Sequence, residues 1–379
     1  MGRRARQWVR ALACVIGGLP AALAASPGTT PALASPAASE RLLLGASVSG
    51  SRVLAVGEQG HIILSDDSGE SWMHAEVPVS LMLTSVTFSD TGTAWAVGHD
   101  GVVLTSDDAG ARWRTVLDGV EIARMQIQAA EAAIAALEAT LDVMTDDDPA
   151  LEDTGYALED AQFDLEDAQE IAETGLTSPL LGITFTTPDR GYAYGAYGVL
   201  VETRDAGQSW SLIADRLDNP DNLHLYDLAV MPSGTLLLVG EAGAVYRSSD
   251  DGETWDRIDL GYGGSLFGVL SLPDGAALAY GLRGRLFRSA DAGERWQEID
   301  SGARATLTGG TVLPDGRTAL VGAGGTLLVG QPAGGALVPM KTPLTGALAS
   351  VVVLDSQTLM VVGFGGVAMV SLGAGTAAP

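Results

Sequence analysis

The sequence predicts an all-β protein: a seven-bladed β-propeller of four-stranded antiparallel blades, with one inserted antiparallel α-helical hairpin. Three observations support this fold class. A unit of about 41 residues recurs seven times along the chain. Glycines at fixed positions mark two tight turns in each unit. Between the second and third units, the spacing of apolar residues changes from alternation to steps of three and four.

The units align on a turn of the form Val-Gly-x-x-Gly or Tyr-Gly-x-x-Gly. The first glycines of the seven turns are Gly57, Gly98, Gly195, Gly240, Gly281, Gly322 and Gly363. A leucine lies 15 residues before each of them, at Leu42, Leu83, Leu180, Leu225, Leu266, Leu307 and Leu348. A period near 41 with four short strands is the length of a propeller blade. Seven sheets arranged radially close a ring and leave few exposed edges.

Residues 1–24 predict an export signal, because four arginines precede an apolar run too short to span a bilayer. Cleavage is expected after Ala24, with Ala34 as a second candidate. The single cysteine, Cys14, lies inside this segment, so no disulfide is expected in the mature chain. Residues 25–40, rich in Ala, Ser, Pro and Thr, are expected to be a flexible lead-in. The predicted location is periplasmic, or lumenal if the source is a phototroph.

Residues 41–116 are expected to form the first two blades. The second unit predicts strands at 83–88, 94–97, 102–105 and 113–117. The turn glycines are expected at positive φ. The seventh unit keeps Ser371 and Gly375 before the chain ends, so it has no outer strand of its own. Residues just before Leu42 could supply that strand and close the ring.

Five units carry an Asp-box, Ser/Thr-x-Asp-x-Gly-x-x-Trp. The Asp can accept backbone N–H bonds across the turn, and the Trp is expected to pack between blades, so we interpret the motif as structural. Its residues are Asp67, Trp72, Asp108, Trp113, Asp205, Trp210, Asp250, Trp255, Asp291 and Trp296. The sixth unit keeps only Gly334, with Leu337 in the place of the Trp.

Residues 117–175 interrupt the repeat and predict a helical hairpin. One heptad stripe contains Val120, Ala123, Ile127, Ala130, Ile134, Leu137, Leu141 and Met144, and a second contains Leu151, Leu158, Ala161, Leu165, Ala168 and Ala172. Asp148 and Pro149 are the expected N-cap and first residue of the second helix. From Asp118 to Glu173 there are 17 acidic residues and one basic residue, Arg124. The hairpin is therefore either a docking arm, a means of oligomerisation, or a solvated arm packed on its own seam.

Residues 176–373 are expected to form blades three to seven, followed by a tail at 374–379. The order of strands places the Gly-x-x-Gly turns, the connections between blades and the hairpin at one end of the ring, and the Asp-boxes at the other. The first end is the candidate partner-binding face. Its candidate residues are Glu58, His99, Asp100, Tyr197, Asn219, His224, Glu241, Arg283 and Phe364.

Charge and motif content restrict the function further. The formal net charge of −26 disfavours nucleic acids and anionic lipid as partners. The four histidines have no metal-ligand spacing, and neither a nucleophile elbow nor a phosphate-binding loop is present. We therefore expect no catalytic residue, no metal and no cofactor. No stretch after the leader is long enough for a membrane helix, so direct membrane insertion is not expected.

On its Asp-boxes and Val-Gly-x-x-Gly turns, over about 41–116 and 176–373, the chain resembles the BNR/Asp-box propellers. It is most similar to the exported branch of the photosystem II stability and assembly factor family that carries a helical insertion. The resemblance implies a non-enzymatic propeller that binds protein and assists a membrane complex or exporter. Sialidases share the Asp-box, so a glycan-binding or glycoside-hydrolase-like propeller is the alternative. That alternative requires an arginine cluster on the catalytic face, where only Arg283 stands at a turn tip.

Overall fold

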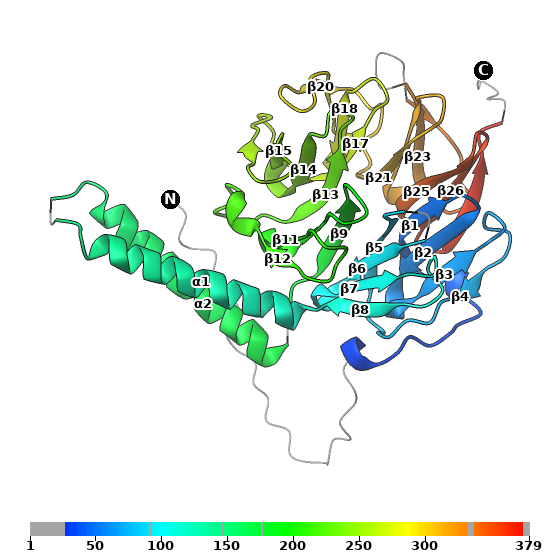
Figure 1. Ribbon diagram of the computed structural model, residues 1–379. Coiled ribbons are helices and arrows are strands. Elements are labelled where there is room, and N and C mark those ends of the chain that lie inside the picture. Colours follow the sequence, from blue (N-terminus) through cyan, green and yellow to red (C-terminus); the bar gives the residue numbers. More distant parts are fainter. Residues whose placement is uncertain (1–26, 91, 146, 176, 332–336, 374–379) are drawn as a thin grey trace, which may run out of the picture.

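The computed structural model describes residues 27–90, 92–145, 147–175, 177–331 and 337–373. Seven antiparallel sheets are arranged radially, and their innermost strands β1, β5, β9, β13, β17, β21 and β25 contact one another in a closed cycle (Figure 1). The predicted seven-bladed propeller with a helical hairpin is therefore confirmed. The expected export signal, Cys14, both cleavage sites, Gly334 and Gly375 lie outside the described residues.

Among the described residues, six blades have four strands, and the seventh has three. Blade 1 contains β1 (Leu43–Ser49), β2 (Arg52–Gly57), β3 (Ile62–Ser65) and β4 (Met73–His74); blade 2 contains β5 (Leu83–Phe88), β6 (Ala94–Gly98), β7 (Val103–Ser106) and β8 (Arg114–Leu117). Blade 3 contains β9 (Leu180–Phe185), β10 (Gly191–Gly195), β11 (Leu200–Thr203) and β12 (Ser211–Leu212); blade 4 contains β13 (Leu225–Val230), β14 (Leu236–Gly240), β15 (Val245–Ser248) and β16 (Asp256–Arg257). Blade 5 contains β17 (Leu266–Ser271), β18 (Ala277–Gly281), β19 (Leu286–Ser289) and β20 (Gln297–Ile299); blade 6 contains β21 (Leu307–Val312), β22 (Thr318–Gly322), β23 (Thr326–Gly330) and β24 (Val338–Pro339). Blade 7 contains β25 (Leu348–Asp355), β26 (Thr358–Gly363) and β27 (Gly366–Ser371).

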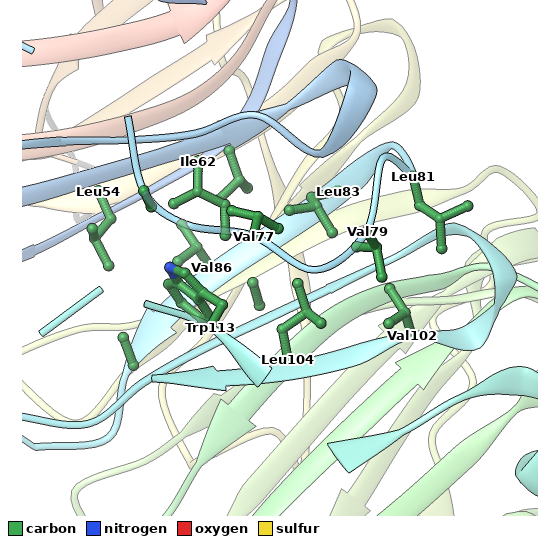
Figure 2. Close-up of a cluster of buried hydrophobic side chains, with 14 of the residues drawn as sticks. Leu54, Ile62, Val77, Val79, Leu81, Leu83, Val86, Val102, Leu104 and Trp113 are labelled. Atoms are coloured by element: carbon green, nitrogen blue, oxygen red, sulfur yellow. The ribbon is translucent and has the colours of Figure 1, made fainter. Parts of the chain in front are cut away.

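The core lies between neighbouring blades because each sheet is apolar on both faces. Figure 2 shows one such layer, between blades 1 and 2, where Trp113 packs with Leu54, Val86 and Leu104. The second strand of each blade is almost wholly buried, as in β6 and β14. Burial on both faces explains why the alternation of apolar and polar residues along these strands is weak.

The alignment of the first unit on Leu42 is wrong by one residue. Leu43 pairs with Gly57, in the way that Leu83 pairs with Gly98 in blade 2. The hairpin between β1 and β2 is one residue shorter than in the other blades, which shifts the inner strand relative to the turn glycine.

The expected outer strand of blade 7 is also wrong. The residues before Leu42 do reach β27, where the backbone of Ser39 lies against Gly366. They form the short 3-10 helix η2 (Ala38–Glu40), in which Arg41 N–H donates to Ala38 O at 3.2 Å. A backbone that turns back on itself cannot present the extended row of groups that a β ladder needs.

The insertion forms two helices, α1 (Gly119–Leu141) and α2 (Leu151–Thr174), which pack against each other and extend away from the ring (Figure 1). Asp118 caps α1 by accepting from Glu121 N–H at 2.9 Å. Ile122 roots the hairpin in the core between blades 2 and 3, beside Trp210. The second helix begins two residues later than expected, because the Asp148 side chain closes a turn onto Ala150 N–H and the helical bonds start at Ala150.

Candidate functional site

The Gly-x-x-Gly turns and the connections between blades lie at one end of the ring, called here the turn end. In every blade the N–H after the first glycine donates to the residue that precedes the inner strand, as from Glu58 to Leu42 O at 3.1 Å and from Phe364 to Ala347 O at 2.8 Å. The turn is thereby fixed over the start of its own blade. Six of the seven turns are short 3-10 helices: η3 (Glu58–Gly60), η4 (His99–Gly101), η5 (Ala196–Gly198), η7 (Glu241–Gly243), η8 (Leu282–Gly284) and η9 (Ala323–Gly325).

The two turn glycines are needed for different reasons. Gly57 has an extended backbone, and a Cβ there would lie 2.0 Å from Leu42 O, so the first position requires glycine for close approach. Gly60 has φ of 72°, which agrees with the expected positive φ at the second position. The residue before the second glycine is also left-handed, including Tyr197 at φ 55° and Arg283 at φ 57°. This conformation aims the second tip residue outward at the turn end.

Four of the nine candidate residues come together, and five do not. Tyr197, Asn219, His224 and Glu241 meet between blades 3 and 4. The other five are distributed around the ring: Glu58 in blade 1, His99 and Asp100 in blade 2, Arg283 in blade 5 and Phe364 in blade 7.

His224 is the centre of the four-residue group. Its Nδ1 accepts a hydrogen bond from Tyr197 N–H at 2.9 Å. Glu241 Oε2 accepts from His224 N–H at 3.2 Å. The Tyr197 and His224 rings meet edge to face, with centroids 4.9 Å apart. The Asn219 side chain bonds the N–H and C=O of Leu223 and thereby shapes the connection that leads to His224.

Two aromatic residues that the sequence did not single out extend this group toward the ring axis. The Tyr226 ring lies 6.3 Å from His224 and 4.9 Å from Phe267, between ring centroids. Both residues directly follow the first leucine of an inner strand, β13 and β17. We call Tyr197, His224, Tyr226 and Phe267 the aromatic strip; it crosses blades 3, 4 and 5 at the turn end.

The strip combines apolar faces with a few polar groups. Tyr197 is 63% exposed, and Tyr226 and Phe267 are half-buried. Burial, and then the charge of Glu241, raises the pKa of Tyr226, so its phenol stays a neutral donor. Half-exposed Glu241 supplies an acceptor beside these rings. Such an arrangement can hold apolar or cationic side chains of a bound segment.

At the other end, the Asp-box aspartates bond their own turns. Asp67 accepts from Ser71 N–H at 2.9 Å and from Ser65 Oγ at 2.7 Å, and bonds from the Ser71 side chain and backbone lower its pKa to about 2. Each Asp-box glycine contacts the preceding blade, as Gly207 contacts Trp95 and Gly252 contacts Tyr192. The motif therefore joins neighbouring blades.

The glycoside-hydrolase alternative requires an arginine cluster on the catalytic face. The structure contains an arginine cluster at the Asp-box end, between blades 3 and 4. Buried Glu202 accepts from Arg190 Nε at 2.7 Å and from Arg204 Nε at 3.0 Å, and Arg216 lies 3.6 Å away. Glu253 pairs with the same arginines from blade 4. The guanidinium groups are thus neutralised within the protein, unlike an anion-binding cluster on an open catalytic face.

The structure also brings together two histidines of blade 1. The His61 and His74 rings have centroids 5.0 Å apart, and burial lowers the pKa of both. Across the described ranges, no group of three or more His, Cys, Asp or Glu residues could hold a metal ion. In the same ranges, no helix is long and apolar enough to cross a membrane.

The chain is similar in sequence to one known protein family. The family model described as photosynthesis system II assembly factor YCF48 matches residues 163–360, just over half of the chain. No curated protein matches the chain.

Similar solved structures include YCF48 bound to D1 peptide, with a TM-score of 0.61 and 14% identity over 91% of this chain and 100% of that one. YCF48 from Cyanidioschyzon merolae has a TM-score of 0.59 and 14% identity over 87% of this chain and 95% of its own. The WD40 β-propeller domain of Doa1 has a TM-score of 0.57 and 10% identity over 90% of this chain and 95% of its own. At these identities the likeness concerns the fold.

Proposed function

The chain belongs to the family of photosystem II assembly factors related to YCF48, and on this premise we propose that it is a non-catalytic protein-binding scaffold. In this proposal the turn end holds a segment of a partner protein on the aromatic strip. A relative in the comparison was solved with a D1 peptide, which supports a peptide as the bound species.

The aromatic strip is the observation that carries the proposal. Three blades contribute one continuous row of rings, and Tyr197 at its outer end is 63% exposed. Rigid aromatic side chains give large contact area at a low cost in side-chain entropy, so they are enriched at protein interfaces. Glu241 beside the strip favours a partner segment with a basic residue among apolar ones.

The place of action is part of the proposal. The arginine-rich start followed by an apolar run supports export, to the periplasm or to a lumen in a phototroph. An exported scaffold of this family would assist a membrane protein complex or an exporter whose exposed segments reach its turn end.

Site-specific cross-linking tests this function. A photoreactive amino acid at position 242, beside the strip, is used to capture partners from the membrane fraction of the source cells. The capture is repeated in a Tyr197→Ala variant. We expect Tyr197→Ala to lose the captured membrane-complex subunit.

The matched control is Met73→Ala, which removes a similarly exposed apolar side chain from β4, away from the turn end. It should capture as well as the unmodified protein. Equal capture by Tyr197→Ala and the control would refute the role of the strip. Binding of glycans in place of protein, lost in Tyr197→Ala, would favour the glycan-binding alternative.

A further inference from the structure

One position of the inner strands holds a carboxylate in blade 4 and a small residue in every other blade. It lies two residues after the first leucine of the strand and pairs with the residue before the turn glycine. Burial of the carboxyl group raises the pKa of Asp227, the residue of blade 4, to about 6, so the charged form is costly in this place. Because six blades form without such a group, blade formation does not explain Asp227. The residues of those six blades are Gly45, Ser85, Gly182, Gly268, Gly309 and Ser350.

The Asp227 carboxylate joins three blades. Its Oδ2 accepts from Val269 N–H of β17 at 2.9 Å, and its Oδ1 accepts from the Tyr194 hydroxyl group of blade 3 at 3.3 Å. The Tyr194 hydroxyl oxygen also accepts from Leu228 N–H at 3.1 Å. Thr184 Oγ1 of β9 donates to Leu228 O at 3.2 Å. These bonds link the inner strands β9, β13 and β17, which belong to the three blades that the aromatic strip crosses.

The Tyr226 and Phe267 rings of the strip belong to bulged residues of β13 and β17. The register of the ladder shifts at each of them. A bulged residue has no partner in the ladder, so its neighbouring contacts decide where its side chain points. Asp227 directly follows Tyr226, and its bond to Val269 reaches β17 two residues after Phe267. This bond therefore joins the two bulges, whose ring centroids lie 4.9 Å apart.

We propose that Asp227 is a positioning residue of the docking surface. Its carboxylate holds β13 and β17 together beside the two bulges and thereby keeps the Tyr226 and Phe267 rings at the spacing that a partner segment recognises. This inference rests on the proposed function, since the spacing matters for binding only if the strip is the binding surface. A row of rings that is already ordered binds at a smaller entropy cost than one that must be ordered on binding.

A fluorine label measures the position of the rings without any partner. 3-Fluorotyrosine is placed at position 226 alone in the full-length protein, and the ¹⁹F line is recorded with and without a second change. Asp227→Ser removes the carboxylate and introduces the residue that blades 2 and 7 carry at this position. Tyr194→Phe removes only the hydroxyl group that bonds Asp227 and Leu228. We expect the line to move by more than its own width, or to split, in both variants, because the fluorine senses the neighbouring Phe267 ring.

The matched control is Thr308→Val. Thr308 Oγ1 donates to Leu348 O at 2.6 Å, so it also joins two inner strands, β21 and β25, through one hydroxyl group. Neither strand contributes a residue to the strip. The ¹⁹F line should therefore stay in place in this variant. Circular dichroism checks that each variant is folded at the temperature of the measurement, and Tyr194→Phe decides alone if Asp227→Ser is unfolded.

Partner binding is measured with the photoreactive residue at position 242 and the membrane fraction of the source cells. Asp227→Ser and Tyr194→Phe should yield roughly a tenth of the captured subunit, whereas Thr308→Val should yield the same amount as the unmodified protein. No side chain of the strip is changed in these variants. A loss of capture in a folded variant therefore reports the positions of the rings.

Three results would overturn the inference. The first is a ¹⁹F line that stays in place in folded Asp227→Ser and Tyr194→Phe. The second is an equal movement of the line in Thr308→Val, which would mean a general loosening of the ring. The third is a line that moves while capture stays unchanged, which would mean that binding does not depend on the spacing of the rings. If the unmodified protein captures no partner, the proposed function fails, and the ¹⁹F comparison still decides whether Asp227 positions the rings.

Discussion

Replacing Glu202 by glutamine tests how the interface between blades 3 and 4 is held together. The Glu202 side chain is 3% exposed and faces Arg190, Arg204 and Arg216. Removing its charge leaves two guanidinium groups that are mostly buried, at 18% and 26% exposure, with Glu253 as the remaining neighbouring carboxylate. Breaking a buried ion pair on one side costs about 3–5 kcal/mol.

The low end of that range applies here. Arg190 and Arg216 keep hydrogen bonds to the carbonyl groups of Asp251 and Gly252 in the Asp-box turn of blade 4. We therefore expect Glu202→Gln to lower the free energy of unfolding by about 3 kcal/mol. For about 340 folded residues, the unfolding entropy of about 0.7 kcal/mol per kelvin converts this loss to a fall in Tm of about 4 °C.

Thermal unfolding followed by circular dichroism at pH 7 measures the effect. The matched control is Glu294→Gln, which removes an exposed carboxylate that pairs with Arg247 at 3.5 Å across the next blade interface. The Glu294 carboxylate is exposed, and the mostly buried Arg247 keeps its hydrogen bond to Ala292 O at 3.1 Å. The pair therefore contributes less than about 1 kcal/mol, and the control should melt within about 1 °C of the unmodified protein. A Glu202→Gln protein that melts as high as the control would show that the carboxylate does not stabilise this interface.

Three further predictions concern pH. Burial raises the pKa of Asp227 to about 6, so the stability that this residue contributes is complete below its unfolded pKa of 3.8 and is lost as the pH rises through 6. Between pH 7 and pH 5, the free energy of unfolding in urea should therefore increase by about 1 kcal/mol more in the unmodified protein than in Asp227→Asn. Equal increases would contradict this prediction. Burial lowers the pKa of His61 and His74, so their neutral forms stabilise the fold above pH 6.5, and this stability is lost as the pH falls below 6.5. The variant His61→Gln should therefore show a smaller decline in Tm below pH 6.5 than the unmodified protein. An unchanged decline would mean that other groups cause the acid sensitivity. Hydrogen bonds from the Thr254 side chain and backbone lower the pKa of Asp250 to about 2. The variant Asp250→Ala should therefore have a lower Tm than the unmodified protein above pH 4, and the difference in Tm should shrink as the pH falls from 4 toward 2. A difference in Tm that does not depend on pH would mean that the charge of Asp250 is not what stabilises the turn.

The strands and the number of blades follow from short-range pattern. In blade 2 the expected and observed strand limits differ by at most one residue, because the turn glycines and the apolar runs are local signals. The ring closure was not predictable in this way. Whether the chain before Leu42 extends or turns depends on its contact with β27, more than 300 residues away in sequence.

The candidate site was only partly predictable for a related reason. Tyr197, His224 and Glu241 were found because they stand in or beside turns of known position. Tyr226 and Phe267 lie within inner strands 41 residues apart, and only the radial arrangement places their rings 4.9 Å apart. Comparing the residue after the first leucine in all seven units would have been the available signal, since the other blades hold only Leu, Thr or Ala there.

The sequence alone determined the seven units, the strand order and therefore which residues lie at the turn end, because these depend on patterns within about 41 residues. It also determined the two apolar stripes of the hairpin and its negative charge. The tertiary structure decided which of those residues meet: the aromatic strip across three blades and Glu202 among three arginines. These groupings join side chains from different blades, turns and connections, and distances of that kind are set by how the sheets pack.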